Sequence, residues 1–155
     1  MVAPLFPPGI LRSMSESSKP LHEKLGIREG MVIGLLNAPN FFELDLGELP
    51  DGVKVLTDSN AGNADLFLIF ADRSDEAQRA FERATAYLPA DGAIWVAWPK
   101  KSSDRDSDLD EDTLRDLFLP SGMVDNKVCS IDETWSALRF VVRKDNRDDW
   151  PRLRA

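Results

Sequence analysis

The stretch MVIGLLNAPNFF, residues 31–42, decides how the rest of the chain is interpreted. It begins with an apolar run after a glycine turn, which is typical of the first strand of an α/β protein that binds a nucleotide. A glycine-rich loop should come next, because a cofactor needs free backbone N–H groups and close approach there. Instead the chain continues with Asn37, Ala38, Pro39 and Asn40, and Pro39 has no N–H group to donate. The sequence thus predicts this kind of fold without its usual binding loop.

The composition limits the kind of partner. The chain has 155 residues, of which 43% are hydrophobic and 30% charged, and its net charge is -8. A chain of this length forms one domain around a single core. No apolar run approaches the roughly 20 residues of a membrane helix, and the negative charge repels nucleic acids and anionic lipids. We therefore expect a small molecule or a protein as the partner, with no nucleic acid and no membrane.

Cys129 and His22 are the only residues of their types. Together they exclude an intramolecular disulfide and a zinc site made of cysteine and histidine, so we expect no metal and a cytoplasmic location. Cys129 lies in an alternating apolar segment and is interpreted as a small buried residue. His22 is expected on a short exposed helix, where it is solvated.

The two ends differ from the middle of the chain. Residues 1–14 contain three prolines and lack periodicity, which predicts a disordered extension. Residues 145–155 form a charged tail that does not bury enough surface to order itself, although Trp150 could dock. A single α/β domain is expected over residues 15–144.

Strand and helix patterns alternate between these ends. Strands are expected at 31–37, 53–58, 65–71, 93–98, 123–131 and 135–143, and helices at 20–25, 74–88 and 111–119, with Ser74 and Asp110 as caps. This order predicts a three-layer, Rossmann-like α/β fold, with a mostly parallel sheet of about six strands that ends in an antiparallel hairpin. The link 59–64 is short for a parallel crossover, so the strand at 53–58 is expected to be short, peripheral or antiparallel.

The order of elements resembles a shortened class I methyltransferase fold, in which the last strand inserts antiparallel beside the fourth. Four segments also resemble a family of small bacterial proteins of unknown function: KLGIREGM at 24–31, LNAP at 36–39, DGAIWVAWPKKSS at 91–103 and VDNKVCSIDETWSALRF at 124–140. This resemblance covers the chain from Ser15 to Lys144 and implies a bacterial, cytoplasmic protein with a methyltransferase-like fold. It supplies no catalytic residue, and the acidic stretch at 102–113 departs from it.

Candidate ligand-binding residues lie where strands end. Asn37 ends the first strand, and Asp58 ends the second, where an acidic residue of these folds meets a ribose hydroxyl. Trp98, Lys100 and Lys101 belong to the motif WPKK at the end of a later strand, and the lysines could hold a small anion. The plainer interpretations are a turn aspartate, a core tryptophan and solvated lysines. The Trp98–Pro99 bond is a candidate for the cis form.

Secondary candidates lie in the motif DETWS. Asp132 and Glu133 could form a carboxylate pair for acid–base chemistry, with Trp135 as a stacking platform. The same residues fit a tight hairpin turn with the tryptophan in the core.

An acidic loop invites a calcium interpretation. Asp104, Asp106 and Asp108 have the spacing of calcium ligands, but Leu109 and Arg115 stand where glycine and glutamate are required. A solvated loop that caps the next helix is the better interpretation.

The residues together favour a binding or interaction module on a methyltransferase-like scaffold, with a degenerate cofactor loop and no cofactor. Catalysis that depends on S-adenosylmethionine is not expected. One alternative is an enzyme or binder that acts on a small anionic metabolite at the carboxyl ends of the strands, using Lys100, Asp58 or the Asp132–Glu133 pair. Another is a methyltransferase with an unorthodox cofactor loop.

Overall fold

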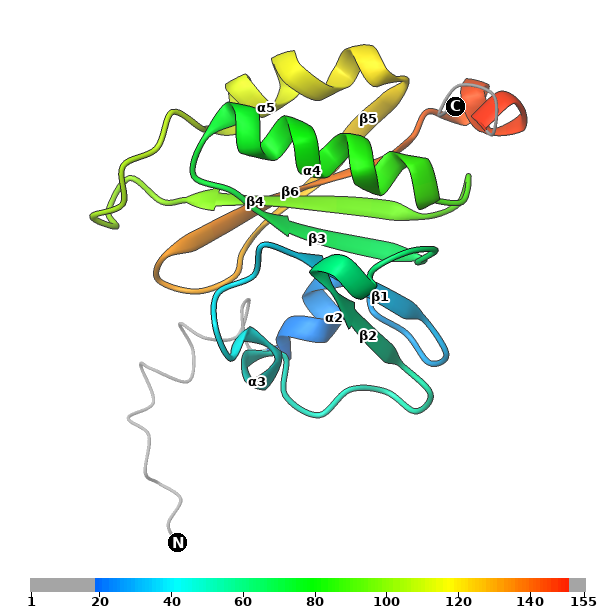
Figure 1. The fold of residues 1–155 in the computed structure, drawn as a ribbon, viewed down its shortest axis with the longest axis horizontal. Coiled ribbons are helices and arrows are strands. Elements are labelled where there is room, and N and C mark those ends of the chain that lie inside the picture. Colours follow the sequence, from blue (N-terminus) through cyan, green and yellow to red (C-terminus); the bar gives the residue numbers. More distant parts are fainter. Residues whose placement is uncertain (1–18, 151–155) are drawn as a thin grey trace, which may run out of the picture.

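Two apolar strands build the centre of the sheet. A computed structural model describes residues 19–150, and in it every residue of β3, Leu66–Phe70, and of β4, Ala93–Pro99, is buried. Both faces of these strands are covered, as is typical of strands that are apolar on both sides. Figure 1 shows the resulting three layers.

Six strands form one sheet in the order β2-β1-β3-β4-β6-β5. The other strands are β1, Val32–Leu36, β2, Lys54–Thr57, β5, Met123–Ser130, and β6, Trp135–Val142. The strands β1, β2, β3 and β4 are parallel to one another, and β6 lies antiparallel between β4 and β5. The predicted α/β fold with a closing hairpin is therefore confirmed, including the insertion of the last strand beside the fourth.

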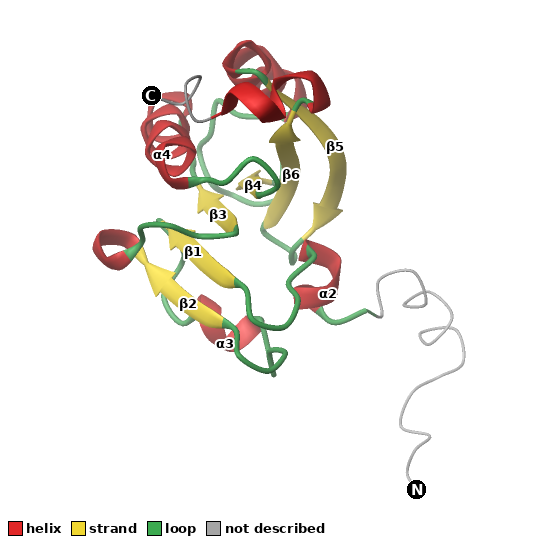
Figure 2. Ribbon diagram, turned by 90° about the vertical axis from the view of Figure 1, so that its right-hand side faces the viewer, coloured by secondary structure: helices red, strands yellow, loops and turns green. Residues whose placement is uncertain are grey.

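The helices lie on opposite faces of this sheet. On one face, α4, Ser74–Tyr87, and α5, Glu111–Phe118, pack through the stacked rings of Phe81 and Phe118, whose centroids are 3.9 Å apart. On the other face lie α2, Leu21–Leu25, and α3, Phe42–Asp45. Figures 1 and 2 show that these two short helices leave much of their face of the sheet without a helical cover.

The strand β2 is short and lies at the sheet edge, parallel to β1. Two of the three expected descriptions are thus correct, and the antiparallel one is wrong. A single turn of 3₁₀ helix, η2, Asp58–Asn60, replaces the usual crossover helix. Arg83 of α4 reaches across the gap and donates to the carbonyls of Asp58 and Ala61. One side chain therefore fastens a connection that normally needs a helix.

A close contact explains why a glycine stands inside β1. A β-carbon at Gly34 would lie 2.7 Å from the ring of Phe67 on the neighbouring β3. The glycine therefore serves packing within the sheet rather than a cofactor loop beyond it.

Two caps were predicted, and one is wrong. Asp110 caps α5 as expected, since its Oδ1 accepts the N–H of Thr113 at 2.8 Å. Ser74 is not the cap of α4: Arg73 holds that position without a side-chain bond, and Ser74 is the first helical residue. A carboxylate from a distant loop binds this helix end instead, which removes the need for a local cap.

The segment that follows β6 has a defined structure as far as Trp150. Residues Lys144–Asp149 form the 3₁₀ helix η4, and Trp150 is 1% exposed with its Nε1 donating to the carbonyl of Leu88 at 2.8 Å. The predicted docking of Trp150 is therefore confirmed, and the expectation that the charged tail lacks order does not hold for residues 145–150. The expected extension at 1–14 and the end of the tail lie outside the described residues.

Three local expectations also have outcomes. His22 is half-buried rather than solvated, and its Nδ1 has no hydrogen-bond partner within the described chain. Cys129 is half-buried, and burial raises the pKa of its thiol. The Trp98–Pro99 bond is trans, like the other peptide bonds of residues 19–150.

None of the helices over this range is long and apolar enough to cross a membrane.

Candidate functional site

The loop after β1 is closed by a contact between two predicted site residues. Asn37 has a left-handed backbone with φ of 61°, and its N–H donates to Oδ1 of Asp58 at 2.9 Å. Asp58 follows β2, which is parallel to β1, so both residues lie at the carboxyl end of the sheet, where the parallel strands end. The structure thus brings Asn37 and Asp58 together, and they bind each other.

A shallow cavity lies beside this contact. Its volume is about 240 Å³, and it is lined by Leu36, Asn37, Asp58, Glu76, Arg79, Ala80 and Arg83. The last four residues come from one face of α4, because positions three and four apart share a helix face. Glu76, Arg79 and Arg83 were not among the sequence candidates, although their helical spacing placed them on one side.

A second cavity of about 210 Å³ adjoins the first, sharing Asn37 and Glu76. Here Arg105 forms two bonds of 2.8 Å to the carboxylate of Asp72, and its guanidinium carbon lies 4.9 Å from the ring centroid of Trp135. The hydrogen bonds to Asp72 raise the pKa of Arg105. The position of Asp72, directly after β3, was the sequence signal that could have identified this pair.

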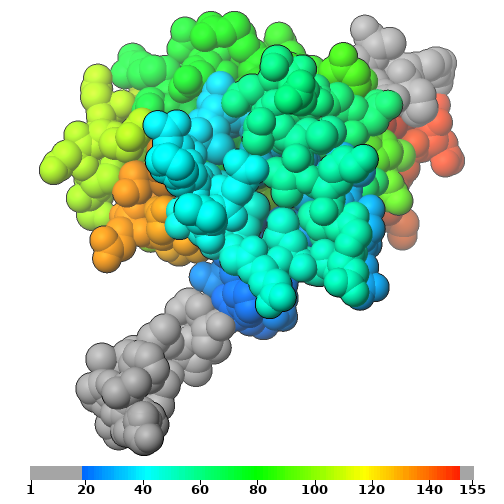
Figure 3. All heavy atoms as spheres, turned by 60° about the horizontal axis from the view of Figure 1, so that its bottom comes forward, coloured from blue at the N-terminus to red at the C-terminus, as the bar shows by residue number. Residues whose placement is uncertain are grey.

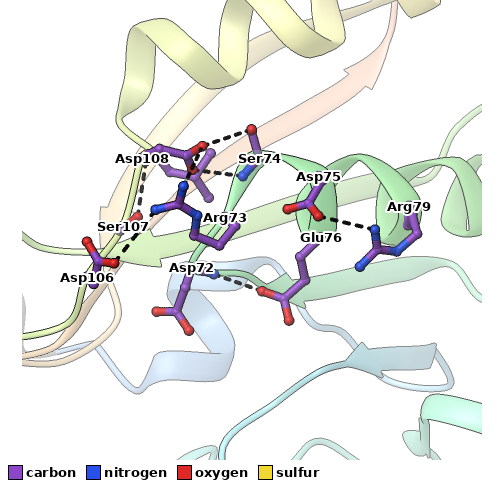
Figure 4. Close-up of polar contacts among 10 residues, drawn as sticks. Asp72, Arg73, Ser74, Asp75, Glu76, Arg79, Asp106, Ser107 and Asp108 are labelled. Atoms are coloured by element: carbon purple, nitrogen blue, oxygen red, sulfur yellow. Dashed lines mark hydrogen bonds and ion pairs between the residues drawn. The ribbon is translucent and has the colours of Figure 1, made fainter.

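The N-terminus of α4 already holds an anion, which the chain itself supplies (Figure 4). The carboxylate of Asp108 accepts the N–H of Ser74 at 2.8 Å and its hydroxyl at 3.0 Å. Arg73 lies 3.8 Å from both Asp106 and Asp108. Burial acts to raise the pKa of Asp108, but the bonds from Ser74 and the charge of Arg73 outweigh it, so the pKa is lowered. The acidic loop therefore acts as a helix cap. Among the described residues, no group of three or more His, Cys, Asp or Glu side chains could hold a metal ion.

The three residues of the WPKK motif point in different directions. Trp98 is 8% exposed and belongs to the core under α4 and α5. Lys100 donates from its Nζ to the hydroxyl of Ser130 at 2.5 Å, while Lys101 is exposed. Neither lysine lines the two cavities described above. The structure therefore separates these residues from Asn37 and Asp58.

The DETWS segment forms a tight turn. Oδ1 of Asp132 accepts the N–H groups of Thr134 and Trp135, at 2.8 and 2.9 Å. Glu133 is exposed, and Trp135 packs edge-on against Phe70 with ring centroids 5.0 Å apart. Only Trp135 reaches a cavity, where it forms part of the wall beside Arg105. The two carboxylates therefore do not line either cavity as a pair.

Comparison with known proteins identifies the class of fold. No protein-family model and no curated protein sequence matches the chain. Solved structures do match, among them a TehB-like SAM-dependent methyltransferase from Corynebacterium glutamicum, with 11% identity over 87% of this chain and 95% of that one and a TM-score of 0.51. The fibrillarin pre-rRNA processing protein of Methanococcus jannaschii is 10% identical over 80% of this chain and 69% of its own, with a TM-score of 0.56.

A third match is an O-methyltransferase family 2 protein from Planctomyces limnophilus, in complex with apigenin. The two proteins are 10% identical, and their structures superpose with a TM-score of 0.54. The match covers 73% of this chain and half the length of the Planctomyces protein. Similarity at this level of identity defines the fold, which is methyltransferase-like, and it carries no activity.

Proposed function

We propose that this protein is a binding or interaction module on a methyltransferase-like scaffold, without catalysis that depends on S-adenosylmethionine. The bond between the Asn37 N–H and the Asp58 carboxylate carries this proposal. In related folds the loop amides hold the cofactor and the acidic residue holds a ribose hydroxyl. Here the N–H of Asn37 donates to the carboxylate of Asp58, so these two groups bind each other. Pro39 has no N–H, which leaves the same loop with one donor fewer.

The size of the cavities supports the same conclusion. Pockets that bury a small molecule have volumes of about 300–1,000 Å³, whereas the two at this end of the sheet have about 240 and 210 Å³. Asp72, Arg105 and Trp135 contact one another in the wall of the second cavity. Cavities of this size are too small to bury an adenosine cofactor.

Exposed apolar side chains on α3 support an interaction role. Phe41 is 78% exposed and Leu44 is 76% exposed, and acidic residues Glu43 and Asp45 lie between and beside them. Phe41 also has an unfavourable left-handed backbone with φ of 65°, and such strain concentrates at functional sites. The space-filling view shows this cyan segment at the surface of the molecule (Figure 3). A protein surface with apolar recesses would complement it.

Calorimetric titration with S-adenosylmethionine and S-adenosylhomocysteine tests the proposal. We expect no saturable heat, with the Corynebacterium methyltransferase as a positive control. A cofactor at a hundred times its dissociation constant would stabilise the fold by about 2.7 kcal/mol, so thermal unfolding provides a second measurement. Saturable binding that the substitution Asp58→Ala weakens would show that the closed loop opens for a cofactor, and the proposal would then be wrong.

The second candidate is a small anionic metabolite at the carboxyl end of the sheet. Arg79 and Arg83 both line the first cavity and favour an anion, whereas Asp58 and Glu76 oppose it. Arg79 is well exposed, so Arg79→Gln should leave the fold intact. If phosphorylated metabolites raise the melting temperature of the parent protein and not of this variant, the second candidate replaces the first.

A further inference from the structure

Arg139 is a half-buried arginine that lacks a carboxylate partner. Arg115, the other half-buried arginine of the described chain, forms ion pairs with Glu111 and Asp125, whereas the hydrogen bond of the Arg139 guanidinium is a long one, 3.3 Å, from Nη1 to Oδ1 of Asn126. A charge removed from water without a counter-charge is costly, so buried charges are normally paired. The exception needs an explanation.

The register of the sheet fixes where Arg139 points. In β6, Leu138 and Phe140 belong to the core under α4 and α5, so Arg139 between them faces the side of α2. Lys127 of β5 is its partner across the strands, and a bulge between Asp125 and Lys127 adds Asn126 beside it. Bulges often direct side chains at functional sites.

A tight turn places a second arginine, Arg28, beside Arg139, with its side chain exposed. After α2, the N–H of Met31 donates to the carbonyl of Arg28 at 3.2 Å, and Gly30 takes the positive φ of 77° that the turn requires. Arg28 and Arg139 together line a hollow of about 160 Å³ at the amino end of the sheet, where the parallel strands begin. An adjoining hollow of about 270 Å³ shares Arg28 and Met31 with it.

Both signs of charge line this hollow, but no carboxylate of the described residues forms an ion pair with Arg139. Burial and the nearby charge of Arg28 lower the pKa of Arg139. Asp65 and Asp91 line the hollow too, but neither forms an ion pair with the arginines within the described chain, and Oδ2 of Asp65 accepts the N–H of Val32 at 2.8 Å. Lys127, the cross-strand partner of Arg139, is exposed outside the hollow, and its Nζ donates to the carbonyl of Lys24 at 3.3 Å.

We propose that Arg28 and Arg139, with Lys127 beside them, bind a ligand that carries one phosphate group. Two guanidinium groups suit the tetrahedral oxyanion, because each can donate two parallel bonds to its oxygens. Asp65 and Asp91 limit the total positive charge, which disfavours polyphosphates and nucleic acid strands. This site lies at the other end of the sheet from the carboxyl-end cavities and is independent of the function proposed for them.

Inorganic phosphate is the first probe. The full chain is titrated with it in a phosphate-free buffer at constant ionic strength, and thermal unfolding and amide chemical shifts are recorded. We expect a saturable rise of the melting temperature by several degrees, with the largest shifts at Arg28, Arg139 and Lys127. Absence of a saturable response, or shifts centred on Arg79 and Arg83, would overturn the proposal.

Two variants separate ligand binding from folding. Arg139→Gln and the exposed Arg28→Gln should each weaken phosphate binding at least tenfold, while Arg73→Gln, which lies at the start of α4 and lines neither carboxyl-end cavity, should bind as the parent does. Because Arg139 forms no ion pair within the described chain, Arg139→Gln should melt no lower than the parent in phosphate-free buffer. Equal phosphate binding by Arg28→Gln and the parent would contradict the proposal even if the other variant failed to fold.

The source of the phosphate group is tested with three further probes. A simple alkyl phosphate tests a metabolite, and phosphatidylcholine vesicles with and without phosphatidic acid test a lipid headgroup. Tighter binding of either than of inorganic phosphate identifies the source and supports the site. Polyglutamate tests a protein carboxylate surface, and its binding in place of phosphate would show that the ligand class is wrong.

Discussion

The two ends of the sheet treat charge in opposite ways. At the carboxyl end, Asp58 accepts a hydrogen bond from the Asn37 N–H, and Arg105 donates two hydrogen bonds to Asp72. These polar groups therefore have partners within the chain. At the amino end, Arg28 and Arg139 share a hollow without a carboxylate bound to either. Ligands of this kind of fold normally sit at the carboxyl ends of the strands. The comparison teaches that polar groups bind one another at the usual place, whereas the two arginines at the opposite end have no bound carboxylate within the described chain.

The largest expected effect on stability comes from removing Trp135, which forms part of the wall of the second cavity. Trp135→Ala deletes a ring that is 5% exposed and packs between Phe70 and Arg105. We expect a loss of about 3–5 kcal/mol in the free energy of unfolding, measured by urea denaturation. Val128→Ala on the exposed strand is the control and should cost less than about 0.5 kcal/mol. A loss no larger than the control would mean that this end is not packed as described.

The next effect tests the anion at the start of α4. Asp108→Ala leaves the N–H of Ser74 without its acceptor and should cost about 1 kcal/mol. Asp106→Ala is a matched control from the same loop, because its side chain is 98% exposed and contacts only Arg73 at 3.8 Å. Equal melting temperatures of the two variants would contradict the capping role.

A pH titration tests the same end of the molecule. The pKa values of Asp108 and Asp110 are lowered by folding, so their stabilisation is complete above the ordinary carboxyl pKa near 3.8 and is lost as the pH falls below it. We expect the acid limb of the stability curve to flatten in the variant Asp108→Asn, Asp110→Asn. An unchanged acid limb would locate the acid sensitivity elsewhere.

Breaking the Arg105–Asp72 pair should have a smaller effect. Both side chains are partly exposed, at 48% and 30%, so solvent screens the pair and Arg105→Gln should cost about 0.2–1 kcal/mol. Tryptophan fluorescence is the more sensitive measurement, because the guanidinium lies over Trp135. A fluorescence spectrum identical to that of the parent would show that the loop does not hold this position in solution.

The smallest effect is expected at the amino end. Arg139→Gln in phosphate-free buffer should change the free energy of unfolding by no more than about 0.5 kcal/mol, or increase it slightly. The free energies of unfolding of Arg139→Gln and Trp135→Ala are measured by chemical denaturation under the same conditions, so that the effects at the two ends of the sheet can be compared directly. A marked loss would mean that Arg139 supports the fold, and the contrast between the ends would disappear.

The sequence predicted the fold better than the site for a physical reason. Continuous apolar runs and helical periodicity act locally, so β3, β4 and α4 could be placed from their own residues. Asn37 and Asp58 were also found, because parallel strands bring their carboxyl ends together. The direction of a side chain after a strand depends on distant partners, and Lys100 turns toward Ser130 for that reason.

Arg139 shows the same limit at the other end of the sheet. In the sequence it alternates with Leu138 and Phe140, as a solvent-facing residue of a strand near a sheet edge does. In the structure β5 covers that edge and the α2 turn faces the guanidinium, so the side chain is half-buried. Neither neighbour can be inferred from the strand alone.

The link between β2 and β3 also has a consequence for protein engineering. Arg83 alone spans a gap that a helix fills in longer chains of this topology. A designed helix and strand could therefore be grafted between Asp58 and Asp65 without altering the order of the other strands. Such an insertion would replace the contacts of Arg83 with the carbonyls of Asp58 and Ala61, so Arg83 would become free for substitution in the enlarged protein.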